Sequence, residues 1–267
     1  MYDRKKFEKL KLIEILDKIS KELKSEIDCY IIGGLAMMFH GTKLATKDID
    51  IVFDYPKEAC EFMETLKIIG FHEVQHVTKD HLKIGAHAVL EGPDECRFDI
   101  FIGNVCSGLI LSEEMKRRAT KVLSLRNLNI FVMSPEDVFL LKSIAQREDD
   151  LADMATIAAM GLNWGDIAKE LKNQPNYWKW LPLYYSSLEA LESEYSVSSP
   201  SKEILQGEAE ICMGMITILQ RMDRPLATDT IVKILDGDEA FALSVLSKMS
   251  GLGLIKEVSG FWILDIK

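Results

Sequence analysis

The chain has 267 residues, of which 48% are hydrophobic and 28% charged, and its formal net charge is −10. This length allows one large domain or two to three small ones, and the acidic balance disfavours a broad nonspecific nucleic-acid surface. Its apolar stretches are too short for a bilayer and its five cysteines form no CxxC pair, which predicts a cytoplasmic protein with reduced thiols and no membrane partner.

The first part of the chain begins with a helical pattern. Apolar residues at three- and four-residue steps predict an amphipathic helix over residues 4–24. A short apolar run at 28–32 then ends in Gly33-Gly34, and residues 35–40 again have a helical pattern. This order predicts a strand, a tight glycine turn and a helix.

Further strand patterns follow. The alternation of residues 49–53 predicts a second strand, and residues 57–69 predict a helix. Residues 81–90 and 96–102 are expected to form a hairpin, with one further strand or a pair of short strands within 123–132. A mixed α+β domain is therefore expected over residues 1–133.

The pattern changes at Ser134-Pro135, which predicts a capped helix start with acidic residues in the first turn. The helical pattern continues to about Leu191. One helix is expected to include residues 138–157, so that Lys142 and Asp153 would share one face. Taken alone, such a stripe is more often a solvated face with local ion pairs, whereas beside a carboxylate site a triphosphate-binding cation is an equal alternative.

The remaining segments predict a separate C-terminal domain. Residues 195–201 have the composition of a linker. Three short helices and a hairpin follow, in the order of a winged helix. The predicted helices cover 209–221, 227–234 and 239–251. We thus predict a domain at 1–133, a helical extension with a linker at 134–200, and a winged-helix-like domain at 201–267.

Three aspartates in strand patterns form the candidate site. Asp48 and Asp50 are two residues apart, so in a strand they project from the same side. Asp99, in the second strand of the predicted hairpin, would complete a two-metal site on an adjacent strand. Carboxylate oxygens suit Mg²⁺ or Mn²⁺. Each motif also has a purely structural interpretation. Paired aspartates are common on solvated strand faces, and Gly33-Gly34 alone is commonly a turn.

In combination these residues resemble the signature of the DNA polymerase β-like nucleotidyltransferase superfamily. The resemblance lies in Ile31-Ile-Gly-Gly-Leu-Ala, His40-Gly41 and Thr46-Lys-Asp-Ile-Asp-Ile. Ser134-Pro-Glu-Asp, with Lys142, Arg147, Asp150 and Asp153, is similar to the helical element of small prokaryotic members such as the AbiE-type toxins. The resemblance covers about residues 28–160. One departure is Gly34, where many active members have serine.

The resemblance implies a nucleotidyltransferase fold, a mixed sheet flanked by helices, and a role for each motif residue. It implies that Asp48 and Asp50 hold metal and that Gly33 and Gly34 contact phosphates. Lys142 would neutralise the triphosphate. Asp150 or Asp153 would support the site.

Together these features predict an enzyme that uses Mg²⁺ or Mn²⁺ to move a nucleotidyl group from an NTP to a hydroxyl. The acceptor could be RNA, a protein or a small molecule. One alternative is a non-catalytic nucleotide-binding regulator that acts through the winged helix, and another is a partner in a toxin–antitoxin pair.

The charge of the C-terminal region bears on its partner. From Gly207 onward, six lysines and arginines face nine acidic residues, and the predicted recognition helix at 239–251 has Lys248 as its one cation. Phosphate neutralisation supplies most nucleic-acid affinity. We therefore expect this domain to make a homodimer or partner contact rather than to bind DNA.

Overall fold

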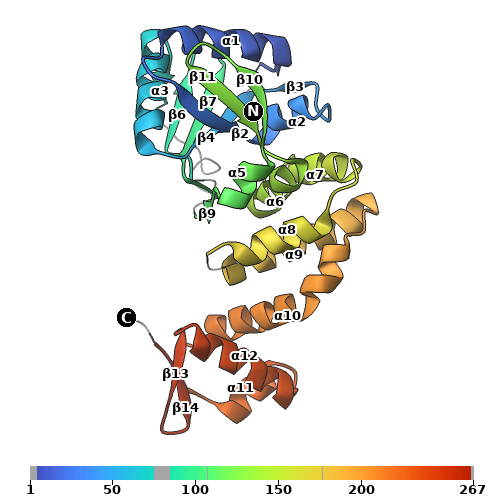
Figure 1. The fold of residues 1–267 in the computed structure, drawn as a ribbon. Coiled ribbons are helices and arrows are strands. Elements are labelled where there is room, and N and C mark those ends of the chain that lie inside the picture. The colour runs from blue at the N-terminus through green and yellow to red at the C-terminus, as the bar shows by residue number, and fades with distance from the viewer. Residues whose placement is uncertain (1–4, 75–84, 107, 176, 266–267) are drawn as a thin grey trace.

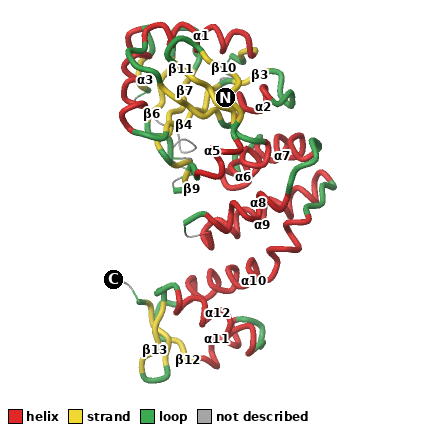
Figure 2. Tube along the Cα trace, viewed as in Figure 1, coloured by secondary structure: helices red, strands yellow, loops and turns green. Residues whose placement is uncertain are grey.

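The structure is a computed structural model that describes residues 5–74, 85–106, 108–175 and 177–265. A sheet unit, a group of helices and a smaller C-terminal unit follow one another along the chain (Figure 1). Strands occur in the first and last units, and the middle is helical (Figure 2). This agrees with the predicted α+β class. Among the described residues, no helix has the length and apolar character needed to cross a membrane.

A seven-stranded mixed sheet forms the first unit, in the order β10-β11-β2-β4-β7-β6-β5. The parallel pairs are β11 with β2 and β4 with β7, and the other neighbours are antiparallel. The bounds are β2 Ile27–Ile31, β4 Asp48–Phe53, β5 His72–Glu73, β6 Ala88–Glu91, β7 Arg97–Ile102, β10 Thr120–Ser124 and β11 Leu128–Val132. The predicted hairpin corresponds to β6 and β7, and residues 81–84 of its first strand lie outside the described residues.

The two faces of the central strands differ in chemistry. On one face, Phe62 of α3 (Pro56–Ile68) packs on Phe53 of β4 and Phe98 of β7, with ring centroids 5.0 and 5.7 Å apart. Helix α1 (Lys9–Glu22) packs against α3. Because side chains alternate along a strand, Asp50 and Asp99 project from the opposite face. That face is the one that carries the candidate site.

Two short ribbons and two short helices complete this unit. The predicted helix over 4–24 is wrong at its start, because β1 (Phe7–Glu8) pairs with β3 (Ala45–Thr46) and α1 begins only at Lys9. The buried side chain of Phe7 explains the difference, since pairing places it in the core. The other elements are α2 Gly33–Phe39, β8 Asn104–Val105, β9 Leu109–Ile110 and α5 Glu113–Arg118.

The middle region is helical, as the sequence predicts, and the structure divides it into four helices. They are α6 Pro135–Ala145, α7 Asp150–Ala158, α8 Trp164–Asn173 and α9 Tyr177–Tyr195. The hydroxyl of Ser134 accepts the Asp137 backbone N–H, as the sequence predicted. The predicted helix over 138–157 is wrong, because Gln146 takes a left-handed conformation with φ of 49° and ends α6. Lys142 and Asp153 therefore face each other across a turn between two helices.

The C-terminal unit has its own core but shares a helix with the middle region. Helix α10 (Pro200–Arg221) begins nine residues before the predicted helix at 209, because Pro200 occupies its first turn. Its first half packs with the main core and its second half, from Met215, with a separate core. The expected linker is correspondingly short, and Ser201 at its end is buried and hydrogen-bonded to Tyr184.

The rest of this unit consists of two helices and a three-stranded sheet in the order β12-β14-β13. The bounds are β12 Leu226–Ala227, α11 Thr228–Ile234, α12 Glu239–Gly251, β13 Ile255–Val258 and β14 Phe261–Leu264. The hairpin matches the one expected from the sequence, whereas the two-residue β12 was not predicted.

Candidate active site

The site begins with a pair of carboxylates on neighbouring strands. Strands β4 and β7 are parallel, with Asp50 opposite Asp99 and Asp48 opposite Arg97. Asp50 and Asp99 are 5% and 2% exposed, so almost no water reaches either carboxyl, whereas Asp48 is half-buried. The register therefore places the third predicted aspartate directly beside the second.

Burial and mutual repulsion disfavour the ionised forms of this pair. Burial is the largest cause that raises the pKa of Asp50, and the charge of Asp48 adds to it, while Arg147 acts in the opposite direction. The pKa of Asp99 is raised well above its usual value by burial and then by the charges of Asp50 and Asp48. A cation bound at the pair would relieve this repulsion.

The glycine turn lies directly against these carboxylates. Gly33 has φ of +61°, and a Cβ built on it would lie 2.0 Å from Asp50 Oδ2. A Cβ at Gly34 would lie 2.3 Å from the hydroxyl oxygen of Thr46. Position 33 therefore requires glycine, and a side chain at position 34 would require Thr46 to shift. The space that a serine side chain would need at position 34 is occupied by the Thr46 hydroxyl, which gives a physical reason for the departure seen in the sequence.

Lys142, Asp150 and Asp153 lie together, as expected, but in an ion-pair network. The ammonium of Lys142 lies 2.7 Å from Asp150 Oδ1 and 2.7 Å from Asp153 Oδ2, and its side chain is 4% exposed. Asp153 also binds Lys43, from the loop between α2 and β3, at 2.8 Å. Lys142 is therefore already neutralised by two carboxylates.

Arg147 is a second cation at the site, and no role for it was predicted from the sequence. Its backbone N–H donates to Asp150 Oδ2 at 2.9 Å, and its Nε donates to the same atom at 3.2 Å. Burial acts to lower the pKa of Arg147, but the charges of Asp50 and Asp150 outweigh burial and raise this pKa. Arg147 stands beside Lys142 and Asp150 in the sequence motif, but its position depends on the break at Gln146, which the helical periodicity did not indicate.

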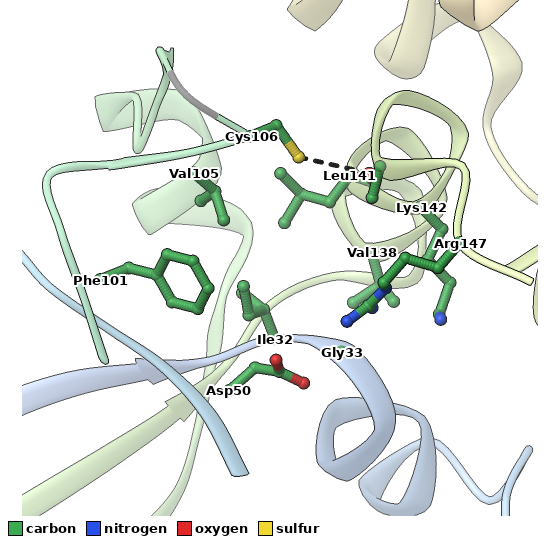
Figure 3. A pocket seen from close by; sticks show the side chains of 11 residues that line it. Ile32, Gly33, Asp50, Phe101, Val105, Cys106, Val138, Leu141, Lys142 and Arg147 are labelled. Carbon is green, nitrogen blue, oxygen red and sulfur yellow. Dashed lines mark hydrogen bonds between the residues drawn. The ribbon is translucent and has the colours of Figure 1, made fainter. Parts of the chain in front are cut away.

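A small cavity joins these groups (Figure 3). In Figure 3 the guanidinium end of Arg147 points toward the carboxylate of Asp50. One side of the cavity is charged and the others are apolar. It is lined by Ile32, Gly33, Asp50, Phe101, Val105, Cys106, Val138, Leu141, Lys142, Ala145 and Arg147.

The predicted residues thus occupy three places in relation to this cavity. Gly33, Asp50 and Lys142 line it. Asp99 lies beside Asp50 in the sheet, and Asp48 lies two residues before Asp50 on the same strand. The other predicted residues lie behind the lining. They are Gly34, against Thr46, and Asp150 and Asp153, both ion-paired to Lys142.

Comparison with known proteins identifies the family. Residues 10–179, more than half of the chain, match the sequence profile described as "Nucleotidyltransferase of unknown function (DUF6036)". The chain belongs to this nucleotidyltransferase family. The match contains every residue of the candidate site and ends within α9, before the C-terminal unit. The predicted membership of a nucleotidyltransferase superfamily is therefore confirmed at this level.

No curated protein matches this chain. A crystal structure from H. pylori, provisionally assigned as a nucleotidyltransferase, is 12% identical over 91% of this chain and 96% of that chain, with a TM-score of 0.35. The family match alone supports the assignment.

The donor set of this nucleotidyltransferase fits a divalent cation in its chemistry. Among the described residues, no group of three or more His, Cys, Asp or Glu side chains is close enough to form a ready metal cluster. The carboxylate pair of Asp50 and Asp99, with Asp48 on the same strand face, nevertheless provides the oxygen ligands that Mg²⁺ and Mn²⁺ prefer. Mg²⁺ commonly takes one or two carboxylates, with the remaining ligands supplied by water and substrate phosphates.

Proposed function

We propose that this protein catalyses the transfer of a nucleotidyl group from an NTP to a hydroxyl, with Mg²⁺ or Mn²⁺ as cofactor. The acceptor would be an RNA, a protein or a small molecule. The observation that carries the proposal is the register pairing of Asp50 with Asp99 beside the Gly33 turn. The fit of the pair to a cation and membership of the nucleotidyltransferase family support it.

The carboxylates would perform the chemical work of this reaction. Asp48, Asp50 and Asp99 would hold the metal, whose contribution when bound is to offset charge on the triphosphate and favour the alkoxide form of the acceptor. The acceptor oxygen forms a bond to the α-phosphorus, and the bond from that phosphorus to the pyrophosphate oxygen breaks. Asp99, which lies opposite Asp50 on the neighbouring strand, would be placed to accept the hydroxyl proton.

The glycine turn and the ion-pair network would position the nucleotide. Without side chains at Gly33 and Gly34, the backbone can approach phosphate oxygens closely. Lys142, with Asp150 and Asp153, would support the triphosphate side of the cavity. Exclusion of water by the apolar walls would strengthen these charged contacts.

The closer relation to AbiE-type toxins belongs to the same proposal. It rests on the motif of Lys142, Arg147, Asp150 and Asp153, which the structure gathers around one turn. A toxin of this kind would arrest growth when expressed without its partner. Normal growth on expression, with transfer activity intact, would exclude the toxin assignment and leave the enzymatic one.

A second candidate is a nucleotide-binding regulator that does not transfer. The observation that favours it is α10, one continuous helix that packs against both the main core and the separate C-terminal core. We propose that the C-terminal unit is a winged-helix module for a homodimer or protein partner, because α12 has a single cation, Lys248, for DNA phosphates. Nucleotide binding without transfer, together with specific operator binding, would support a DNA-binding regulator instead.

The test of the main proposal is calorimetric titration with ATP or CTP in Mg²⁺, followed by transfer of labelled nucleotide to candidate acceptors. We expect binding by the wild type and loss of binding in an Asp48→Ala/Asp50→Ala variant. No binding by the wild type, or equal binding by the variant, would overturn the proposal.

A further inference from the structure

Two cationic side chains, Lys142 and Arg147, line the cavity. They differ in their exposure to solvent and in how closely carboxylates already neutralise them. Lys142 is 4% exposed, with two carboxylates 2.7 Å from its ammonium. The Arg147 side chain is 31% exposed. A ligand could therefore reach Arg147 without displacing an existing partner, whereas it would have to break two ion pairs to reach Lys142.

The guanidinium of Arg147 also retains hydrogen-bonding capacity. Within the described part of the chain, its side-chain hydrogen bonds go to Asp150, from Nε at 3.2 Å and from Nη2 at 3.4 Å. A guanidinium has five N–H donors in a planar arrangement that matches two oxygens of a phosphate. Since Arg147 and Asp50 line the same cavity, the remaining donors can meet a phosphate bound near the carboxylates.

Lys142 lies at the centre of a chain of alternating charges. The order is Lys43, Asp153, Lys142, Asp150 and Arg147, with each neighbouring pair in contact. Three cations and two carboxylates leave one net positive charge. Because Arg147 ends the chain at the cavity, opposite Asp50, a phosphate bound there together with a cation on Asp50 would meet that charge.

We propose that Arg147 contacts the phosphates of the bound nucleotide, and that Lys142 is a positioning residue that holds Arg147 in place through Asp150. This rests on the proposed function and gives Arg147 the direct contact that the family resemblance had suggested for Lys142. The ligand class is a nucleoside triphosphate, recognised through a bidentate contact to phosphate oxygens.

The positioning role of Lys142 follows from the geometry of the turn. Asp150 accepts the backbone N–H of Arg147 as well as its side chain, so one carboxylate fixes both the chain path and the guanidinium. Lys142 holds the other oxygen of the same carboxylate. Without Lys142, Asp150 could turn away and the orientation of Arg147 would be lost.

The experiment measures the dissociation constant of ATP with Mg²⁺ for the wild type and for Arg147→Gln, Arg147→Lys and Lys142→Met. A charged bidentate contact supports an expected rise of about tenfold or more in Arg147→Gln, with a smaller rise in Arg147→Lys. Arg117→Gln, at a 71% exposed arginine, is the matched control and should bind like the wild type. Melting temperatures show whether each variant folds.

The double variant Lys142→Met/Arg147→Gln separates positioning from general destabilisation. If Lys142 acts through Arg147, the double variant should bind no more weakly than Arg147→Gln alone. Additive losses would overturn the positioning role. Wild-type affinity in Arg147→Gln would overturn the contact while leaving the proposed function intact, and absence of binding by the wild type would overturn both.

Discussion

Gly33 lies against Asp50 so closely that a Cβ at position 33 would fall 2.0 Å from the carboxylate oxygen Oδ2. The backbone of Gly33 also has φ of +61°, a conformation that side chains rarely adopt. Both features make glycine necessary at this position. The Gly33-Gly34 turn and the carboxylate pair are thus one packed unit, and a change in either should disturb the other.

Gly33→Ala should therefore destabilise the protein. The clash and the left-handed backbone together predict a loss of about 1–3 kcal/mol in the free energy of unfolding. Gly207→Ala is the matched control, because Gly207 is exposed within α10 and an added Cβ would meet nothing within 4 Å. That change should stabilise by roughly 0.5–1 kcal/mol. Urea unfolding measures the free energy of unfolding of both variants. Equal stability of the two would contradict the close packing of Gly33 against Asp50.

Gly34→Ser tests the relation between the turn and Thr46. The new Cβ would lie 2.3 Å from Thr46 Oγ1, so we expect destabilisation and weaker nucleotide binding. Thr46→Ala removes that oxygen. The double variant Gly34→Ser/Thr46→Ala should regain part of the loss, with a coupling of about 0.5–3 kcal/mol in a double-mutant cycle. If the two changes in stability simply add, the Thr46 hydroxyl does not fill the space that a side chain at position 34 would need.

Arg118 should matter far more than its neighbour Arg117. Arg118 bridges Asp137 and Glu170, whose side chains are each 1% exposed, and thereby fastens α5 to α6 and α8. Arg118→Ala would leave two buried carboxylates unpaired, which predicts a loss of about 3–5 kcal/mol. Arg117→Ala removes an exposed pair with Glu114 and should cost about 1 kcal/mol or less. Similar midpoints of urea unfolding for the two variants would refute this difference.

Asp99→Asn should stabilise the protein without ligand at neutral pH. The pKa of Asp99 is raised in the folded state, so between the ordinary carboxyl pKa and the raised value the folded protein binds more protons than the unfolded chain. Its stability then falls as pH rises through that window. Asparagine has no such penalty. The advantage of the variant should be largest above the raised pKa and vanish below the ordinary one, and a constant difference across pH would contradict this.

The sequence indicates which aspartates share a strand face, but it does not indicate which strands lie side by side. The same-face placement of Asp48 and Asp50 follows from strand periodicity alone. The pairing of Asp50 with Asp99 depends on β7 lying beside β4, a long-range choice that local pattern does not contain. The strand order is set by the packing of a whole sheet.

The ion-pair network around Lys142 was even harder to predict from the sequence. Periodicity predicted one helix through Lys142 and Asp153, but Asp150 accepts the backbone N–H of Arg147 and stabilises a turn after Gln146. A side chain that competes with helical hydrogen bonds can reset a boundary that periodicity does not reveal. The proposed role of Arg147 depends on that turn, which helical periodicity does not indicate.

The affinity for Mn²⁺ with ATP, measured by calorimetry at neutral pH for the wild type and for Asp99→Asn, tests whether the buried carboxylate pair binds a metal with its nucleotide. The substitution keeps the size of the side chain and removes one carboxylate of the buried pair. We expect the wild type to bind the metal and nucleotide together, and Asp99→Asn to lose this binding while unfolding at a higher temperature. Equal binding by the two proteins would contradict a metal–nucleotide site at Asp50 and Asp99.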